Sequence, residues 1–195
     1  MSFVAPMTTE PKHPHDDAPP SGGDLARLFG LEELRIGRHY LRDTDRARVS
    51  SVWIQSLWYA DIIPSFHARS IVCVIAAKGE EFRKKTRPDW HKAAFATPFQ
   101  SAVVEVDTDP VADALNGFDL FRQSGVMSLD GIGYKVVFET LELHGSLTFG
   151  NPSQPRLVAL ESALHSLASQ VARRSNAKEL GEAVEVWNQY KVGRG

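Results

Sequence analysis

The clearest alternation of apolar and polar residues lies between residues 117 and 150. Within it, Asp130-Gly131 separates two apolar runs, and Tyr134, Val136 and Phe138 then alternate with neighbours that are mostly polar. Asp-Gly at such a place favours a type I′ hairpin turn, because both central residues of that turn need a positive φ. The pattern predicts a meander of antiparallel strands over 118–123, 126–129, 134–139 and 141–149, with Gly145 as a bulge or turn.

The spacing of apolar residues changes from two to three and four after Pro155. Five residues share the new spacing and would form one face of a helix that begins at about Arg156: Leu157, Leu160, Leu164, Leu167 and Val171. Glu161 and His165 lie off this apolar face, so the pattern predicts that both point away from the core.

A last helix is predicted after Asn176. Asn176 and Glu179 resemble a capping box, in which the side chain of each residue bonds the backbone of the other. The apolar face of this helix would consist of Leu180, Ala183, Val184 and Trp187.

Two strands of different kinds are predicted in the middle of the chain. Residues 70–77 are apolar at nearly every position, which is typical of a strand covered on both faces. Residues 101–107 alternate, which is typical of a half-buried strand. The charged stretch 78–92 is predicted as a connector. Asp109-Pro110 has the N-cap and early proline that open many helices, here a short one to Leu115.

Residues 46–63 fit two patterns. Val49, Val52 and Leu57 suit a helical face, whereas Val52, Ile54 and Trp58 suit part of a strand. We interpret this segment as a helix that ends before Pro64, because a residue preceding proline disfavours the α conformation.

Further towards the N-terminus, a short helix is predicted with Asp24 as its N-cap, and residues 35–45 are predicted as a loop or an edge strand. Residues 1–23, rich in proline and polar residues, predict a flexible tail. Residues 24–195 predict a single globular α+β domain. Its fold class would be an antiparallel β-sheet of about five or six strands, including the C-terminal meander, with helices packed on one face.

Composition and charge narrow the class of protein. The 195 residues carry a formal net charge of −2, which gives no overall attraction to nucleic acid or to a membrane surface. Cys73 is the one cysteine, so a disulfide within the chain is excluded, and its apolar neighbours predict burial. The longest apolar run is far shorter than a spanning helix needs, and the N-terminus shows no signal-peptide pattern. We therefore expect a soluble cytoplasmic protein without membrane partners.

Residues that could carry catalysis or hold a metal are scattered. His13, His15, Asp16 and Asp17 have the atoms of metal ligands but lie in the predicted tail. Glu105, Asp107 and Asp109 follow a strand, but an N-cap role explains Asp109 without a cation. Ser65, His67 and Asp61 lie too close in sequence to favour a catalytic triad. We expect no catalytic residues, no metal and no cofactor.

Two segments are candidate binding surfaces. The first is a basic patch with an aromatic residue, of the kind that binds phosphates and stacks bases: Arg83, Lys84, Lys85, Arg87, Trp90 and Lys92. The second is an aromatic segment that would pack in the core or meet a protein partner: Trp53, Trp58 and Tyr59.

These observations favour a non-catalytic interaction or regulatory protein, a subunit or partner-binding factor of a bacterial multiprotein system. A protein partner or a homo-oligomer is expected. The alternative is a nucleic-acid-binding accessory factor that uses residues 83–92. A hydrolase with dispersed Asp and His residues is a third, less favoured hypothesis.

Overall fold

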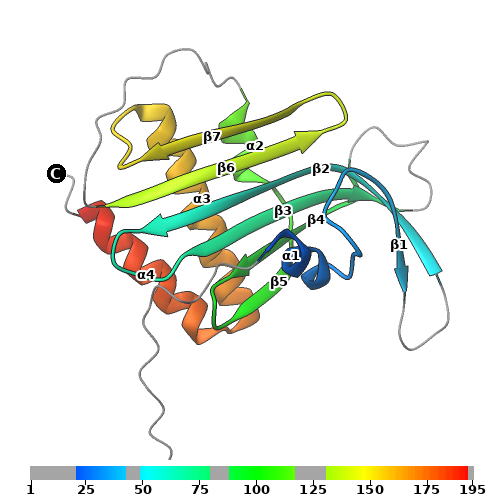
Figure 1. The fold of residues 1–195 in the computed structure, drawn as a ribbon, viewed down its shortest axis with the longest axis horizontal. Coiled ribbons are helices and arrows are strands. Elements are labelled where there is room, and N and C mark those ends of the chain that lie inside the picture. Colours follow the sequence, from blue (N-terminus) through cyan, green and yellow to red (C-terminus); the bar gives the residue numbers. More distant parts are fainter. Residues whose placement is uncertain (1–20, 43–48, 80–87, 117–130, 193–195) are drawn as a thin grey trace, which may run out of the picture.

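The described residues form one antiparallel sheet of seven strands and four helices (Figure 1). The computed structural model describes residues 21–42, 49–79, 88–116 and 131–192. The strands are β1 Gly37–Arg42, β2 Val49–Pro64, β3 Ser70–Lys78, β4 Trp90–Ala96, β5 Ser101–Val106, β6 Ile132–Thr140 and β7 His144–Gly150. The helices are α1 Gly22–Leu28, α2 Pro110–Leu115, α3 Pro155–Ser175 and α4 Lys178–Val192. The fold is the α+β class that the sequence predicts.

The sheet is built around β2. The strand order is β5-β4-β3-β2-β6-β7, and β1 also pairs with β2. One edge of β2 pairs with β3, and its other edge pairs with β1 over residues 49–54 and with β6 over residues 56–64. The helix predicted over residues 46–63 is therefore wrong for the described part of that segment, which is a strand of 16 residues.

A bulge in β2 explains that error. The pairing with β3 shifts register between Ile54 and Ser56, which leaves Gln55 as the extra residue. Val52 and Ile54 face the same side of the sheet as Leu57, so the buried positions on that side change from even to odd numbers. A bulged strand thus spaces its apolar residues by two and by three, and the spacing of three resembles that of a helix.

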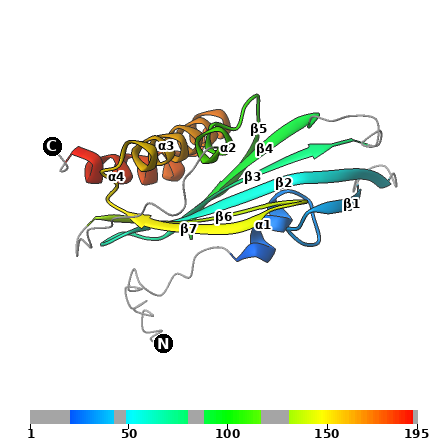
Figure 2. The ribbon, with the colours of Figure 1, turned by 90° about the horizontal axis from the view of Figure 1, so that it is seen from above.

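The two faces of the sheet are covered unequally (Figure 2). Helices α2, α3 and α4 lie on one face, where they enclose the larger core. Helix α1 packs on the other face, with Leu25, Ala26 and Phe29 against β2 and β3 residues such as Ile54 and Cys73. The predicted packing of helices on one face holds for the three later helices, and α1 is the exception.

The N-terminal elements refine two predictions. Ser21, not Asp24, caps α1: the Ser21 hydroxyl accepts from the Asp24 backbone N–H, and the Asp24 carboxyl accepts from the Ser21 backbone in return. Helix α1 therefore begins at Gly22, inside the stretch predicted as tail. Of the two interpretations of residues 35–45, the edge strand is confirmed by β1 over residues 37–42. Residues 1–20 lie outside the described residues.

Strand β4 was not predicted. Its first residues, Trp90, His91 and Lys92, fall in the stretch predicted as a charged connector, and its last four residues are buried. Those residues are Ala93, Ala94, Phe95 and Ala96. The apolar run is short and rich in alanine, which has low β propensity, so local pattern gave no strand signal. The predicted strand over residues 70–77 is confirmed by β3, buried at every position, and the one over residues 101–107 by β5.

The described part of the meander is confirmed. β6 and β7 form an antiparallel hairpin whose turn at residues 141–143 is closed by hydrogen bonds to Thr140. Gly145 is neither a bulge nor a turn: it pairs with Phe138, whose ring would meet a Cβ at 2.5 Å. The strands predicted over residues 118–123 and 126–129 lie outside the described residues.

Helices α3 and α4 meet at a left-handed residue. Asn176 has φ 54° and is the C-cap of α3, so the capping box predicted for Asn176 and Glu179 does not form. The Glu179 backbone N–H instead donates to the Gln100 side chain at 3.2 Å. No helix in the described part of the chain is long and apolar enough to span a membrane.

Most of the predicted apolar face of α3 is confirmed, but two residues of that helix are misplaced by the prediction. Leu160, Leu164, Leu167 and Val171 are fully buried. Glu161 and His165 are also buried, at 2% and 4% exposure, although the spacing places them off the apolar face. Both side chains point towards β6, where they form hydrogen bonds with the Tyr134 hydroxyl.

Replacing Gly131 with alanine should destabilise the protein by about 1–3 kcal/mol, because a side chain at such a backbone conformation is strained. Gly131 has φ 145°, and a Cβ there would lie 2.0 Å from Oδ1 of Asn151, which accepts a hydrogen bond from Ile132. The measurement is urea unfolding.

The matched control is Gly181→Ala in α4. A Cβ at Gly181 meets nothing within 4 Å. Alanine is the better helix former, so this change should stabilise by about 0.5–1 kcal/mol. A loss of stability in both variants would contradict the conformational reason given for Gly131.

Candidate functional site

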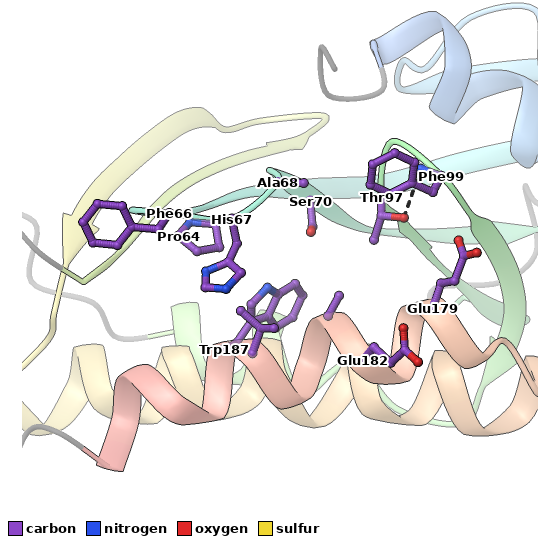
Figure 3. A pocket seen from close by; sticks show the side chains of 12 residues that line it. Pro64, Phe66, His67, Ala68, Ser70, Thr97, Phe99, Glu179, Glu182 and Trp187 are labelled. Carbon is purple, nitrogen blue, oxygen red and sulfur yellow. Dashed lines mark hydrogen bonds between the residues drawn. The ribbon is translucent and has the colours of Figure 1, made fainter. Parts of the chain in front are cut away.

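A cleft of about 460 Å³ lies between α4 and the ends of two hairpins (Figure 3). We call it the α4 cleft. One wall is the β2–β3 turn, another is the β4–β5 turn, and α4 forms the floor. The lining residues are Pro64, Phe66, His67, Ala68, Ser70, Thr97, Phe99, Glu179, Glu182, Ala183, Val186 and Trp187. Its volume falls in the range of ligand-binding clefts, about 300–1,000 Å³.

The cleft is held at both ends by contacts to α4. At one end, Nδ1 of His67 lies 3.0 Å from the Tyr190 hydroxyl, and the two rings meet edge to face. At the other end, Oε1 of Gln100 accepts the backbone N–H of Glu179. The α4 residues that line the cleft run from Glu179 to Trp187, a distance of about 12 Å along the helix axis.

Two phenylalanines stand exposed at the mouth of the cleft. Phe66 is 72% exposed on the β2–β3 turn, and Phe99 is 68% exposed on the β4–β5 turn. Their turns are held in place: the Thr97 hydroxyl accepts from the backbone N–H groups of Phe99 and Gln100. The Ser65 hydroxyl donates to the Gly131 carbonyl and accepts from the Gly131 N–H. Large aromatic side chains on fixed turns are typical of interfaces, where they supply contact area at low entropic cost.

The charged side chains that line the cleft are acidic. Among the described residues that line it are two carboxylates, Glu179 and Glu182, and neither lysine nor arginine. Glu182 pairs with Lys178 at 3.2 Å, but both side chains are more than half exposed, so water screens this pair. Figure 3 shows the Glu179 side chain rising from α4 towards the β4–β5 turn, with His67 and Trp187 nearer the other end.

A buried polar cluster lies behind the floor of the cleft. The Tyr134 hydroxyl donates to Oε1 of Glu161 at 2.7 Å and lies 2.8 Å from Nε2 of His165. Nδ1 of the same His165 ring lies 3.4 Å from Oδ1 of Asn188. The His165 ring packs against Trp187 with 5.3 Å between ring centroids. The cluster therefore fixes the tryptophan that lines the cleft.

The aromatic segment 53–59 is divided between the two faces of the sheet. Trp58 is buried in the core under α3, and its Nε1–H donates to Oδ2 of Asp109 at 2.7 Å. Tyr59 packs on the α1 side, and Trp53 is half-buried. The structure does not bring these three side chains together on one surface.

The basic patch is described only in part. Arg83, Lys84, Lys85 and Arg87 lie outside the described residues. Trp90 and Lys92 lie at the start of β4, where Nζ of Lys92 sits 4.9 Å from the centre of the Trp90 ring. The Lys92 ammonium thus lies over one face of the Trp90 ring, and a base would stack on a face of this ring.

The other candidates of the sequence have separate partners. Asp61 pairs with Arg69, Ser65 with Gly131, and His67 with Tyr190, so these three residues form no catalytic triad. Asp107 pairs with Arg174, whereas Asp109 caps α2 as predicted, accepting from the N–H groups of Val111 and Ala112. No group of three or more candidate metal ligands occurs in the described part of the chain. Cys73 is buried as expected, and burial raises the pKa of its thiol far above the usual range.

Burial raises the pKa of Asp109 above its ordinary value, while the hydrogen bond from Trp58 opposes this shift. The folded-state pKa thus exceeds that of the unfolded chain, so this group's contribution to stability falls as pH rises through the interval between the two values. Trp58→Phe removes the opposing donor and should raise the pKa of Asp109 further. The measurement is a carboxyl ¹³C NMR titration.

Tyr59→Phe is the control for this titration, because its side chain lies on the opposite face of the sheet. It should leave the Asp109 midpoint unchanged. A lower midpoint in Trp58→Phe would contradict the assigned role of the indole hydrogen bond.

Comparisons of the chain with protein-family models, with curated proteins and with solved structures found no match. The candidate site therefore rests on its own geometry. The sequence did not reveal it, because its walls come from three separate elements and isolated phenylalanines at turns carry no periodic signal. The one local clue was the pair of turn sequences, Pro64 to His67 and Pro98-Phe99, in which an aromatic residue follows closely after a proline.

Proposed function

We propose that the protein is a non-catalytic binding protein that receives an extended segment of a protein partner in the α4 cleft. The observation that carries this proposal is the pair of exposed phenylalanines, Phe66 and Phe99, on held turns at the mouth of the cleft. Both rings line the cleft, and most of each ring also remains exposed to solvent. A chain that crosses the mouth would cover them.

The dimensions suit a short peptide segment. A cleft about 12 Å long accommodates about four residues of extended chain, since each residue of a strand advances about 3.3 Å. The floor supplies apolar contacts from Ala183, Val186 and Trp187. The contacts of His67 with Tyr190 and of Gln100 with Glu179 hold the walls before binding, which reduces the ordering cost of association.

Selection from a random peptide display library tests the proposal. The wild-type protein should enrich peptides that lose binding to Phe66→Ser/Phe99→Ser. The control variant Tyr40→Ser changes an aromatic residue that is 60% exposed on β1, away from the cleft, and should retain binding. Peptides that bind all three proteins equally, or no enrichment at all, would overturn the proposal.

The nucleic-acid hypothesis stays a prediction with its own test. If residues 83–92 bind oligonucleotides, affinity should fall steeply with salt, and Lys84→Ala/Lys85→Ala should abolish it. No binding at low salt would contradict this hypothesis. The bacterial complex and the cytoplasmic location stay predictions as well. The homo-oligomer also stays a prediction, and measuring mass by light scattering before and after deletion of residues 1–22 tests whether the predicted tail contributes to it.

A further inference from the structure

The floor of the α4 cleft divides into an acidic end and an apolar end. Glu179 and Glu182 line the part near the start of α4, and Ala183, Val186 and Trp187 line the part that follows. The aromatic rings of Phe99 and His67 stand over the two parts respectively (Figure 3). An occupant that matches both parts carries a positive charge beside an apolar group.

The carboxylates are available to such an occupant. Glu179 has no ion pair among the described residues, and its side chain points towards the β4–β5 turn. The dipole of α4 favours an acidic residue in the first turn, which accounts for a carboxylate at position 179. The helix dipole does not account for Glu182, which lies one residue beyond that turn. Glu182 forms an exposed ion pair with Lys178, and an incoming cation can replace Lys178 in that pair.

The spacing along α4 fixes the spacing in the partner. The midpoint of Glu179 and Glu182 lies four residues before the midpoint of Ala183 and Val186, a separation of about 6 Å along the helix axis. In an extended chain, residues two apart point to the same side and lie about 6.6 Å apart. One basic and one apolar side chain in that relation reach both parts of the floor.

We propose that the α4 cleft recognises an extended segment of a protein partner in which a lysine or arginine lies two residues from a bulky apolar residue. This inference rests on the proposed function and adds the chemistry of the partner. The basic side chain pairs with Glu179 and Glu182, and the apolar side chain contacts Ala183 and Val186. The exposed rings of Phe66 and Phe99 cover the backbone of the segment.

Synthetic octapeptides test this inference by fluorescence anisotropy. Each contains glycine and serine apart from one lysine and one leucine, placed two residues apart in either order. At least one order should bind, and the same peptide with lysine replaced by glutamate should bind at least fivefold more weakly. A peptide with lysine and leucine adjacent should also bind more weakly, because its two side chains point to opposite sides.

Variants of α4 locate the effect. Glu179→Gln/Glu182→Gln should weaken the lysine peptide about fivefold and reduce its dependence on salt, as expected for two exposed ion pairs. Glu185→Gln is the matched control: it removes the same charge from the same helix at an exposed position outside the cleft lining, and should leave affinity within about twofold.

The outcomes separate this inference from the proposed function. Display-selected peptides could require Phe66 and Phe99 for binding and yet bind with the same affinity whether they contain lysine or glutamate. That result would overturn the preference for a basic residue but would support the proposed binding function. Equal effects of Glu185→Gln and of the double variant would also overturn it. A dimer of the protein that dissociates on Phe66→Ser would replace the partner segment by a second copy of the chain.

Discussion

Replacing Leu164 with alanine should lower the free energy of unfolding by about 2–5 kcal/mol, the range for leucine-to-alanine changes in packed cores. Leu164 is fully buried in the core between α3 and the sheet. The loss combines the transfer free energy of the removed atoms with the cavity that they leave. Urea unfolding followed by circular dichroism measures the change, and an unchanged m-value would show that both proteins unfold the same surface.

Val158→Ala is the control for that measurement. Val158 belongs to the same helix but is 38% exposed. Its replacement removes little buried surface and favours the helix slightly, so the free energy of unfolding should change by no more than about 0.5 kcal/mol. Similar losses in the two variants would contradict the packing described for α3.

Tyr134→Phe should lower the free energy of unfolding by about 2–4 kcal/mol, because it removes two buried hydrogen bonds, each worth about 0.5–1.5 kcal/mol, or about 1.5–3 kcal/mol where the partner is charged. The change removes one hydroxyl that both Glu161 and His165 contact, and it leaves the ring packed against Phe149. Thermal and urea unfolding measure the loss. Tyr40→Phe, at an exposed tyrosine, should be neutral.

A double-mutant cycle distinguishes the cluster from simple packing. Glu161→Leu with Tyr134→Phe should cost less than the sum of the two single changes, because both single changes break the same hydrogen bond. Additive losses would show that the hydroxyl and the carboxyl contribute independently.

The fold class followed from the sequence because strands with regular alternation and helices with regular spacing carry their own signal. β6, β7 and the leucine face of α3 are of this kind. β2 was mistaken for a helix because the bulge at Gln55 moves its buried residues from even to odd positions. Side chains alternate between the two faces of a sheet only while the pairing register is unchanged. A bulge shifts that register, and the amino-acid composition does not show where it occurs.

Burial of polar residues was missed for a related reason. Glu161 and His165 are charged or polar residues beside an apolar face, and such residues are usually exposed. Their burial depends on Tyr134, a residue 27 positions away from Glu161 that pairs with it only after the sheet has formed. Periodicity within one helix contains no information about a partner on another element.

The candidate site shows the same limit more strongly. The α4 cleft joins residues from the β2–β3 turn, the β4–β5 turn and α4, and β4 was not predicted at all. Exposed phenylalanines gain meaning only when two turns place them beside one cleft. Trp58 and Tyr59, which are adjacent in sequence, face opposite sides of the sheet and share no surface.

The change of partner along β2 has a consequence for how the protein opens. β1 and β6 occupy successive parts of one edge, so the hydrogen bonds of β1 break without disturbing those of β6. Helix α1, which precedes β1, packs on the face away from α3 and α4. Local opening of residues 21–42, which contain α1 and β1, would therefore leave the larger core and the α4 cleft in place.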